Sequence, residues 1–229
     1  MTTTAVIIPA LNEEESLPLV LQELPSELVD RVFVVDNGST DGTASVARAA
    51  GAVVVSEPRR GYGAACLAGI AAADGFDVLV FLDADYSDYP QDLIELHAPV
   101  ARGEADLVIG SRMVNADARG ALLPQARFGN WLASRLMRLL FGVRCTDLGP
   151  FRVITGAGLA ALGMRDRDYG WTVEMQLRAH LRGLRVVEVP VRYRPRLGQS
   201  KISGTVRGTI MAGYKILKTI LGYRVAPPR

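Results

Sequence analysis

Short runs rich in β-branched residues alternate with longer segments rich in alanine and leucine over roughly the first half of the chain. This alternation is typical of βαβ units, in which successive strands lie parallel and a helix crosses the sheet between them. Each connecting segment is long enough for such a crossover, so we predict an α/β fold with a mainly parallel sheet flanked by helices. The expected strands are residues 5–9, 31–36, 52–56, 77–83 and 106–109, and the expected helices are residues 13–24, 41–50, 63–73 and 90–102.

The length of 229 residues, with 49% hydrophobic and 22% charged residues, suits one larger domain with a substantial core. This balance excludes a disordered chain, a collagen-like repeat and a small disulfide-stapled scaffold. Cys66 and Cys145 are too few for a disulfide framework and lack metal-ligand spacing, so we expect reduced thiols and a cytoplasmic protein. We expect no signal peptide, because no cationic segment precedes a long apolar one, and no transmembrane helix, because no stretch reaches about 20 apolar residues.

Charge is unevenly distributed along the chain. Residues 192–229 hold nine lysines and arginines and no acidic residue, whereas the other 191 residues hold 17 basic and 24 acidic ones. A body of charge −7 therefore carries a tail of charge +9 within a net charge of +2. Such a tail predicts an anionic partner, which on charge alone is a phosphate group, a membrane surface or nucleic acid.

Polar residues follow three of the expected strands. In a parallel α/β sheet, ligands bind outside the carboxyl ends of the strands, so these loops are the candidates for a site. We expect their carboxylates to converge at one edge of the sheet. The three loops are Pro9-Ala10-Leu11-Asn12-Glu13, Asp36-Asn37-Gly38-Ser39-Thr40-Asp41-Gly42 and Asp83-Ala84-Asp85.

Asp83 and Asp85 come directly after an apolar strand, at positions i and i+2. Two hard oxygen donors so placed can hold Mg²⁺ or Mn²⁺ and leave coordination positions for a diphosphate. The alternative is that both aspartates cap a turn. The turn formers of residues 36–42 can cap the next helix. A turn does not explain Asp36, a carboxylate at the strand end that could accept hydrogen bonds from a ribose or a base.

A glycine-containing segment at residues 59–65 offers a rival interpretation. It superficially resembles a dinucleotide fingerprint, and Asp83 lies 20 residues after Gly63, where a ribose-binding acid would stand. In that class the glycine loop follows the first strand and has a third glycine, and neither holds here. We therefore disfavour a nicotinamide or flavin oxidoreductase. We expect Gly61 and Gly63 to allow a close approach of the backbone to a ligand or a neighbouring strand.

Four motifs stand in order along the chain: Val6 to Glu13, Val34 to Thr43, Asp83-Ala84-Asp85 and Gly110-Ser111-Arg112. Together they resemble the signatures of family 2 glycosyltransferases of the GT-A fold, most nearly the dolichyl- and polyprenyl-phosphate sugar synthases, over about residues 5–201. The resemblance implies a nucleotide-diphospho-sugar transferase domain with a Rossmann-like sheet in residues 1–203. A basic amphipathic helix would follow in residues 204–229, as part of the same domain or associated with a membrane.

The same resemblance implies a metal-dependent, inverting transfer of a hexose from a UDP- or GDP-sugar to a polyprenyl or dolichyl phosphate. Its implied donor site, including the Mg²⁺ or Mn²⁺ ligands Asp83 and Asp85, comprises Pro9, Ala10, Glu13, Asp36, Asp83, Ala84, Asp85, Arg196 and Lys201. Arg196 and Lys201 belong to a loop similar to the family's mobile arginine and Gly-x-Ser-Lys segment, which closes over the diphosphate.

On the acceptor side, the resemblance implies that Arg112 and Arg127 grip a phosphate. Arg152 lies in a segment similar to the family's Gly-Phe-Arg, although Pro150 replaces the glycine. Glu174 is either an acid near the acceptor or a charge on a helix surface. The expected catalytic residues are Asp85, Arg112, Arg127 and Lys201.

Two departures from the family pattern leave the nucleotide open. Asn37 stands where a second aspartate is frequent, and Tyr86-Ser87-Asp88 replaces the Leu-Gln-His common in mannose-phosphate-lipid synthases. A UDP-sugar is therefore at least as consistent with the sequence as GDP-mannose.

A phosphate acceptor changes what the chemistry requires. A hydroxyl needs a general base, whereas a phosphate monoester already carries about −1.5 to −2 charge at neutral pH. Arginines that hold this nucleophile in line with the sugar replace the base. The two histidines, His97 and His180, lie in no motif, and we expect them to be structural or exposed.

Residues 204–222 show a helical period. One stripe carries apolar side chains and the adjacent face carries cations, so the helix either packs on the body or lies in a membrane interface. We favour the interface, because a polyprenyl acceptor is met at a bilayer, and expect a peripheral protein on the inner membrane face. The apolar stripe is Val206, Ile210, Tyr214, Leu217 and Leu221, and the cations are Arg207, Lys215 and Lys218.

The sequence also leaves some other partners and activities to consider. We expect no nucleic acid, because the tail's tyrosines form no stacking platform, and the sequence leaves a homo-oligomer open. The nearest alternative is a transferase of the same fold with a soluble acceptor such as a sugar phosphate. A nucleotidyltransferase and a non-catalytic sugar-nucleotide sensor are less favoured.

Overall fold

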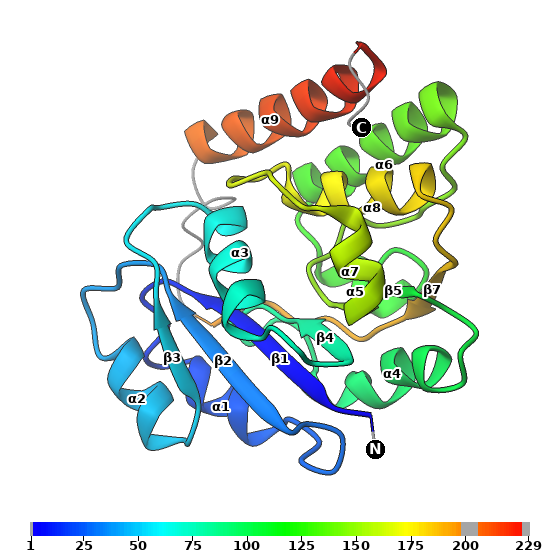
Figure 1. Ribbon diagram of the computed structural model, residues 1–229. Coiled ribbons are helices and arrows are strands. Elements are labelled where there is room, and N and C mark those ends of the chain that lie inside the picture. Colours follow the sequence, from blue (N-terminus) through cyan, green and yellow to red (C-terminus); the bar gives the residue numbers. More distant parts are fainter. Residues whose placement is uncertain (1, 198–205, 226–229) are drawn as a thin grey trace.

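The computed structural model describes residues 2–197 and 206–225, and these residues build one seven-stranded sheet (Figure 1). The strand order is β3-β2-β1-β4-β6-β5-β7. β6 runs antiparallel to both neighbours and every other pair is parallel, which confirms the predicted mainly parallel sheet. The strands are β1 (Thr4–Ala10), β2 (Arg31–Asp36), β3 (Val53–Ser56), β4 (Val78–Phe81), β5 (Leu107–Ser111), β6 (Arg152–Thr155) and β7 (Val186–Pro190).

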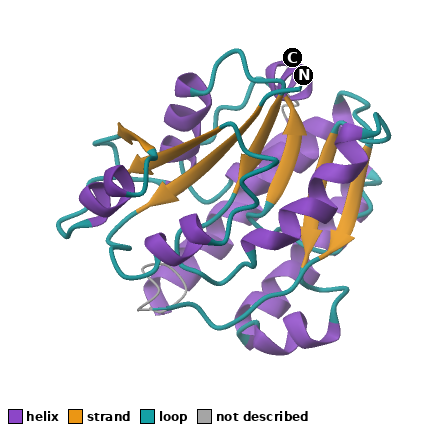
Figure 2. Cartoon of the chain, turned by 90° about the horizontal axis from the view of Figure 1, so that it is seen from below, coloured by secondary structure: helices purple, strands orange, loops and turns teal. Residues whose placement is uncertain are grey.

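Helices cover both faces of the sheet (Figure 2). Alternate residues of β1 point to opposite faces, so Val6 and Ile8 join one core with α1, α2 and α4, while Ala5 and Ile7 join another with α3, α7 and α8. The helices are α1 (Leu17–Gln22), α2 (Thr43–Ala49), α3 (Tyr62–Ala72), α4 (Leu93–Ala101), α5 (Ala116–Ala121), α6 (Pro124–Phe141), α7 (Gly156–Leu162), α8 (Trp171–Leu181) and α9 (Val206–Val225).

The expected elements are confirmed, with changes at their ends. The helix expected over residues 13–24 begins only at Leu17, because residues 12–14 donate their backbone N–H groups to side chains of the loop after β2 and of Thr43, the first residue of α2. The helix expected over residues 90–102 opens as a 3₁₀ turn, Pro90–Asp92, before α4. Every other expected element lies within two residues of its predicted ends.

The register of β1 places the polar loops together. Ala10 pairs with Asp36 of β2, and Ile7 pairs with Phe81 of β4. Because these strands are parallel and end at the same edge, the loops that follow them meet there, as predicted.

The C-terminal helix α9 packs on α6 and α8. Ile220 is fully buried in an apolar cluster that includes Met137 and Leu177. The Tyr223 hydroxyl donates a hydrogen bond to Glu174 Oε1 at 2.9 Å. Apolar and polar contacts therefore both anchor α9 to the body. Across the parts of the chain that the structure describes, no helix is both long enough and apolar enough to cross a membrane.

The predicted apolar stripe of α9 is divided in the structure. Tyr214 and Leu221 are exposed, whereas Leu217 lines a cavity against the body. The predicted basic face is wrong for Lys215, which lies 3.2 Å from the Asp168 carboxylate and so faces the body. The side chains of Val206, Arg207 and Ile210 lie outside the described part of the structure.

We expect Ile220→Ala to lower the free energy of unfolding by about 2–4 kcal/mol, because it leaves a cavity under α9. Leu221→Ala is the matched control: this neighbouring side chain is 53% exposed, and we expect a change below about 0.5 kcal/mol. Urea denaturation of both variants measures the difference. Equal losses would show that α9 does not pack as described.

Candidate active site

A cavity of about 220 Å³ opens where the loops after β1, β2 and β4 meet. It gathers most of the residues predicted for a donor site: Pro9, Ala10, Glu13, Asp83, Ala84, Asp85 and Arg196. Asp36 is not among the lining residues, and Lys201 lies outside the described residues. The cavity is also lined by residues that were not among the predicted site residues: Leu11, Asn37, Arg60, Gly61, Tyr62, Ala65 and Tyr169.

Asp36 takes part in the turn after β2, a role that the sequence had not led us to expect for it. Its Oδ1 accepts a hydrogen bond from Ser39 N–H at 2.9 Å. The loop after β1 is tied to the same turn, because Asn12 N–H donates to Ser39 Oγ at 2.9 Å. A contact of Asp36 with a ribose or a base stays a prediction.

Asn37 holds a third loop against the cavity. Its Nδ2 donates to the carbonyl oxygens of Glu57 and Arg59 at 2.8 and 2.7 Å, and its Oδ1 accepts from Gly61 N–H at 2.9 Å. An ionised aspartate has no donor and could not make the first two bonds. The departure from the family pattern at this position was the available signal for that structural role.

Gly61 and Gly63 allow a close backbone approach, as predicted, but the neighbour is the loop before α8 and not a strand. A Cβ atom on Gly61 would lie 2.2 Å from the carbonyl oxygen of Arg167, and one on Gly63 would lie 2.2 Å from that of Asp166. Gly61 also has a φ of 143°, which disfavours other residues. The glycines thus fix the position of residues 166–169, and Tyr169 lines the cavity.

Asp83 and Asp85 are suited to a divalent cation. Asp83 Oδ1 is buried and has no hydrogen-bond partner among the described residues. Desolvation, and then repulsion from Asp85, raise the pKa of Asp83 to about 7. A bound cation would supply the missing partner and stabilise both carboxylates. In the described ranges, no group of three His, Cys, Asp or Glu side chains is arranged to hold a metal ion.

Arg196 pairs with one of these two carboxylates, Asp85, and with Glu13. Its Nη1 lies 3.2 Å from Asp85 Oδ2, and its Nη2 donates to Glu13 Oε1 at 2.8 Å. The next residue is held as well, because Leu197 N–H donates to the Asp85 carbonyl oxygen at 3.1 Å. The basic segment that precedes residues 198–205 therefore lies beside Asp85, where a diphosphate on a cation would need positive charge.

Arg112 is held by a buried carboxylate that the sequence had not assigned to it. Its Nε and Nη2 each donate to an Asp147 oxygen at 2.8 Å, and Asn130 Nδ2 donates to Asp147 Oδ1. Burial opposes the ionisation of Asp147, but Arg112 outweighs it and lowers its pKa. Tyr193 packs its ring 5.0 Å from the guanidinium carbon. The signal for this partner was an aspartate just before the segment that contains Arg152.

Arg112 and Arg127 lie in the walls of neighbouring cavities. Arg112 lines an apolar cavity of about 450 Å³ between α6, α8 and α9. Arg127 is exposed on α6 and lines a shallow hollow beside it, and Phe128 borders both. The apolar cavity is lined by Arg112, Gln125, Ala126, Phe128, Gly129, Asn130, Leu132, Ala133, Leu148, Thr172, Gly213, Ile216 and Leu217.

The structure does not expose Arg152 or Glu174 to an acceptor. Arg152 is fully buried and donates to the carbonyl oxygens of Gly149 and Thr172, both at 2.8 Å. Glu174 is 3% exposed, so it is not a helix surface charge, and it binds Arg178, Tyr223 and the backbone N–H groups of residues 165 and 166. Both side chains join α8 to its surroundings, and direct contact with an acceptor would require them to leave these partners.

Comparisons with known proteins agree with this geometry. The model of the family described as glycosyl transferase family 2 matches residues 5–166. An uncharacterized glycosyltransferase of Mycobacterium tuberculosis is 44% identical over 216 residues, which cover 94% of this chain and 96% of that protein. An undecaprenyl-phosphate mannosyltransferase of Micrococcus luteus is 36% identical, over 88% of each chain.

A solved structure shares the fold. The complex of glucosyl-3-phosphoglycerate synthase from Mycobacterium tuberculosis with Mn²⁺, UDP and glucosyl-3-phosphoglycerate has a TM-score of 0.75 and 26% identity. The alignment covers 99% of this chain and 81% of that one.

We expect the metal-free protein to lose stability as the pH rises from about 4 to about 7, because the buried Asp83 must then ionise in the folded state. The pKa of its carboxyl is about 7 when folded and near 3.9 when unfolded. Over this interval the folded state binds the extra proton, so the free energy of unfolding falls by up to about 1.4 kcal/mol per pH unit.

Asp83→Asn cannot ionise, so its stability should fall less steeply with pH. Denaturant unfolding in EDTA at pH 5, 6 and 7 compares the two proteins at equal ionic strength. Parallel pH profiles for wild type and variant would contradict the assignment.

Proposed function

Because the chain belongs to glycosyltransferase family 2, we propose that it transfers a hexose from a nucleotide-diphospho-sugar to a polyprenyl phosphate. The chain is a glycosyltransferase with the predicted GT-A fold. The observation that carries the lipid acceptor is the apolar cavity of about 450 Å³ with Arg112 in its wall. The relative named undecaprenyl-phosphate mannosyltransferase supports the same acceptor class.

The polar cavity between the strand ends is the donor site in this proposal. Pro9, Ala10 and Asn37 form walls on which a nucleoside can pack, and Asp83 and Asp85 lie beside them. The Mn²⁺ and UDP of the neighbouring solved structure support a divalent cation at these carboxylates. Bound there, Mg²⁺ or Mn²⁺ would neutralise charge on the diphosphate leaving group. Arg196 and Lys201 would add positive charge from the basic segment.

Arg112 is suited to hold the acceptor phosphate. Asp147 engages its Nε and one N–H of Nη2, which leaves about three of the five guanidinium N–H groups for another anion. Burial opposes the charge of Arg112, but Asp147 outweighs it and raises the pKa, so the group stays cationic. Asp147 and Tyr193 fix the side chain, which orients its remaining donors. Arg127 would bind the phosphate from the outer side of α6.

No histidine is needed as a base in this reaction. His97 is hydrogen-bonded to Thr4 Oγ1 at 3.3 Å, and His180 is exposed on α8, as the sequence predicted. Neither lines the donor cavity. A phosphate oxygen is already anionic and attacks the anomeric carbon directly, with inversion, while the arginines hold it in line.

A polyprenyl chain is met at a bilayer, so the proposal includes a peripheral position at an anionic membrane surface. The exposed part of α9, with Tyr214, Lys218 and Leu221, supports that position.

The second candidate is a soluble acceptor, because the structural neighbour binds glucosyl-3-phosphoglycerate. We expect the radiolabelled product from UDP-glucose or GDP-mannose and undecaprenyl phosphate to partition into butanol, with inverted anomeric configuration by NMR. Transfer to 3-phosphoglycerate, with label confined to water and none in butanol, would select the soluble acceptor instead.

We expect Asp85→Asn to lower kcat at least about 100-fold, because the variant loses the carboxylate that would bind the cation near the leaving group. Unfolding by urea should change little, since Asp85 is partly open to solvent. Asp92→Asn, on a carboxylate paired with Arg192 away from the cavity, is the control. Turnover of the Asp85 variant at the wild-type rate, or wild-type turnover that persists in excess EDTA, would contradict this role.

A further inference from the structure

Helix α6 exposes a continuous apolar and basic face. Phe128 and Trp131 are 61% and 51% exposed, and their rings lie 5.9 Å apart. Leu139 is also exposed, about one turn beyond Arg135 and next to Arg138. At 100° per residue these side chains fall within about 120° of arc. The face comprises Arg127, Phe128, Trp131, Arg135, Arg138 and Leu139.

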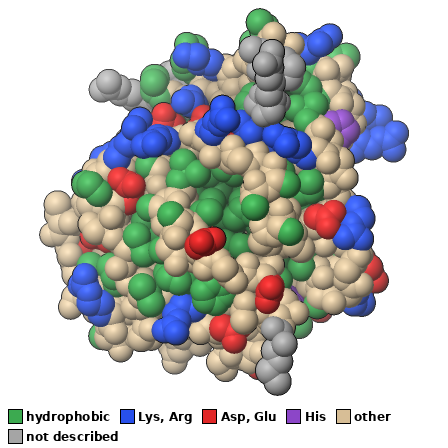
Figure 3. All heavy atoms as spheres, viewed as in Figure 1, with side chains coloured by type: hydrophobic (Ala, Val, Ile, Leu, Met, Phe, Trp, Pro, Cys, Tyr) green, Lys and Arg blue, Asp and Glu red, His purple; other side chains and the backbone are tan. Residues whose placement is uncertain are grey.

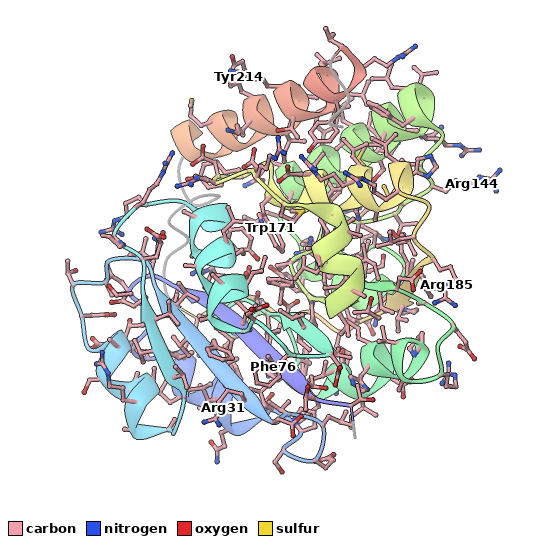
Figure 4. All side chains as sticks on the ribbon, viewed as in Figure 1. Arg31, Phe76, Arg144, Trp171, Arg185 and Tyr214 are labelled. Carbon is pink, nitrogen blue, oxygen red and sulfur yellow. The ribbon has the colours of Figure 1, made fainter. Side chains whose placement is uncertain are left out.

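Helix α9 presents a similar face beside it. Its inner side packs on α6 through the cluster around Ile220, and its outer residues follow a spacing of three and four. Tyr214 points away from the body in Figure 4. Its outer face comprises Met211, Tyr214, Lys218, Leu221 and Val225, all of them exposed. Among the described residues, these two adjacent helices therefore leave large apolar side chains exposed.

The charges of the two helices have one sign. Neither α6 nor α9 contains an acidic residue. Figure 3 shows basic side chains gathered around the upper part of the molecule, where α9 lies. Arg135 and Lys218 lie 6.0 and 5.9 Å from the ring centroids of Trp131 and Tyr214. Among the described side chains, no carboxylate forms a salt bridge with Arg127, Arg135, Arg138 or Lys218.

The apolar cavity lies at the same place. Phe128 from α6 and Ile216 and Leu217 from α9 line it, and Arg112 forms part of its wall. The exposed face thus borders the cavity that the proposed function assigns to the acceptor.

We infer that the outer faces of α6 and α9 form one membrane-docking surface, in which Phe128 and Trp131 enter the boundary between headgroups and acyl chains and the arginines contact anionic headgroups. The location of this surface beside an acceptor cavity rests on the proposed function, whereas the docking itself does not. Aromatic rings suit this depth because they are amphipathic or apolar and rigid, and cations suit the anionic surface around them.

The sign of the charge favours a bilayer over a second copy of the chain. An isologous dimer through this face would bring α6 arginines of both copies together, without carboxylates on either helix to pair with them. An anionic headgroup layer neutralises the same charges.

The two tryptophans make the inference directly measurable. Trp131 is half exposed on α6, whereas Trp171 is fully buried in the core; Figure 4 labels Trp171 in the interior of the molecule. The full chain is mixed with vesicles of phosphatidylcholine containing 30% phosphatidylglycerol, with and without brominated acyl chains, in the absence of any sugar donor or polyprenyl phosphate. We expect brominated lipid to quench Trp131, and Trp131→Phe, which retains Trp171, to show no quenching.

Matched variants test which side chains bind. We expect Phe128→Ala to weaken vesicle partitioning about fivefold and the pair Arg135→Gln with Arg138→Gln to weaken it by about tenfold or more. Ile94→Ala and Arg31→Gln are the controls, because both are exposed on parts of the molecule away from α9, and neither should change partitioning. Near-ultraviolet circular dichroism confirms that each variant is folded.

Three results would overturn the inference: no binding to anionic vesicles at low salt, binding without quenching of Trp131, or a dimer in solution that Trp131→Ala dissociates. The last result would assign the surface to a second copy of the chain. The vesicle experiment contains no acceptor, so a failure to bind vesicles would not contradict the proposed activity. That activity is tested separately, by transfer to polyprenyl phosphate in detergent. Quenching of Trp131 with no lipid product would instead support the surface and reject the proposed acceptor.

Discussion

The parallel pairing of β1 with β2 and β4 is the constraint on which the site depends. β1 lies in the interior of the sheet and contributes to both cores, so its register cannot shift without moving apolar side chains to the wrong face. That register ends three strands at one edge and brings Glu13, Asn37 and Asp85 to one cavity. Residues that are far apart in the chain thereby become neighbours, and only backbone pairing is needed to do it.

Buried charge then determines what the cavity can bind. Desolvation and repulsion from Asp85 raise the pKa of Asp83. A bound cation would offset both effects at these two carboxylates. Arg112 is different, because Asp147 compensates its charge in a fixed geometry. Arg152 has two carbonyl partners, and desolvation lowers its pKa to about 10. Arg112 and Arg152 are both arginines, but they therefore differ in how available they are to a ligand.

Outside the sheet, helices α6 and α9 each have one packed face and one exposed face. Ile220 and Tyr223 attach α9 to α6 and α8, so α9 is part of the folded body. Tyr214 and Leu221 remain outside. One helix thus has an inner face that stabilises the fold and an outer face that is free to meet a partner. The same division holds in α6, where Met137 is buried and Trp131 is exposed.

The order of strands and helices over the first half of the chain, the polar loops at the strand ends and the paired aspartates could be predicted from the residues alone, because these features depend on local periodicity and on residues adjacent in the chain. The antiparallel insertion of β6, the pairing of Asp147 with Arg112, and the burial of Arg152 and Glu174 could not be predicted in this way. Each of them depends on segments distant in sequence packing together, and the same packing left particular side chains of α6 and α9 exposed.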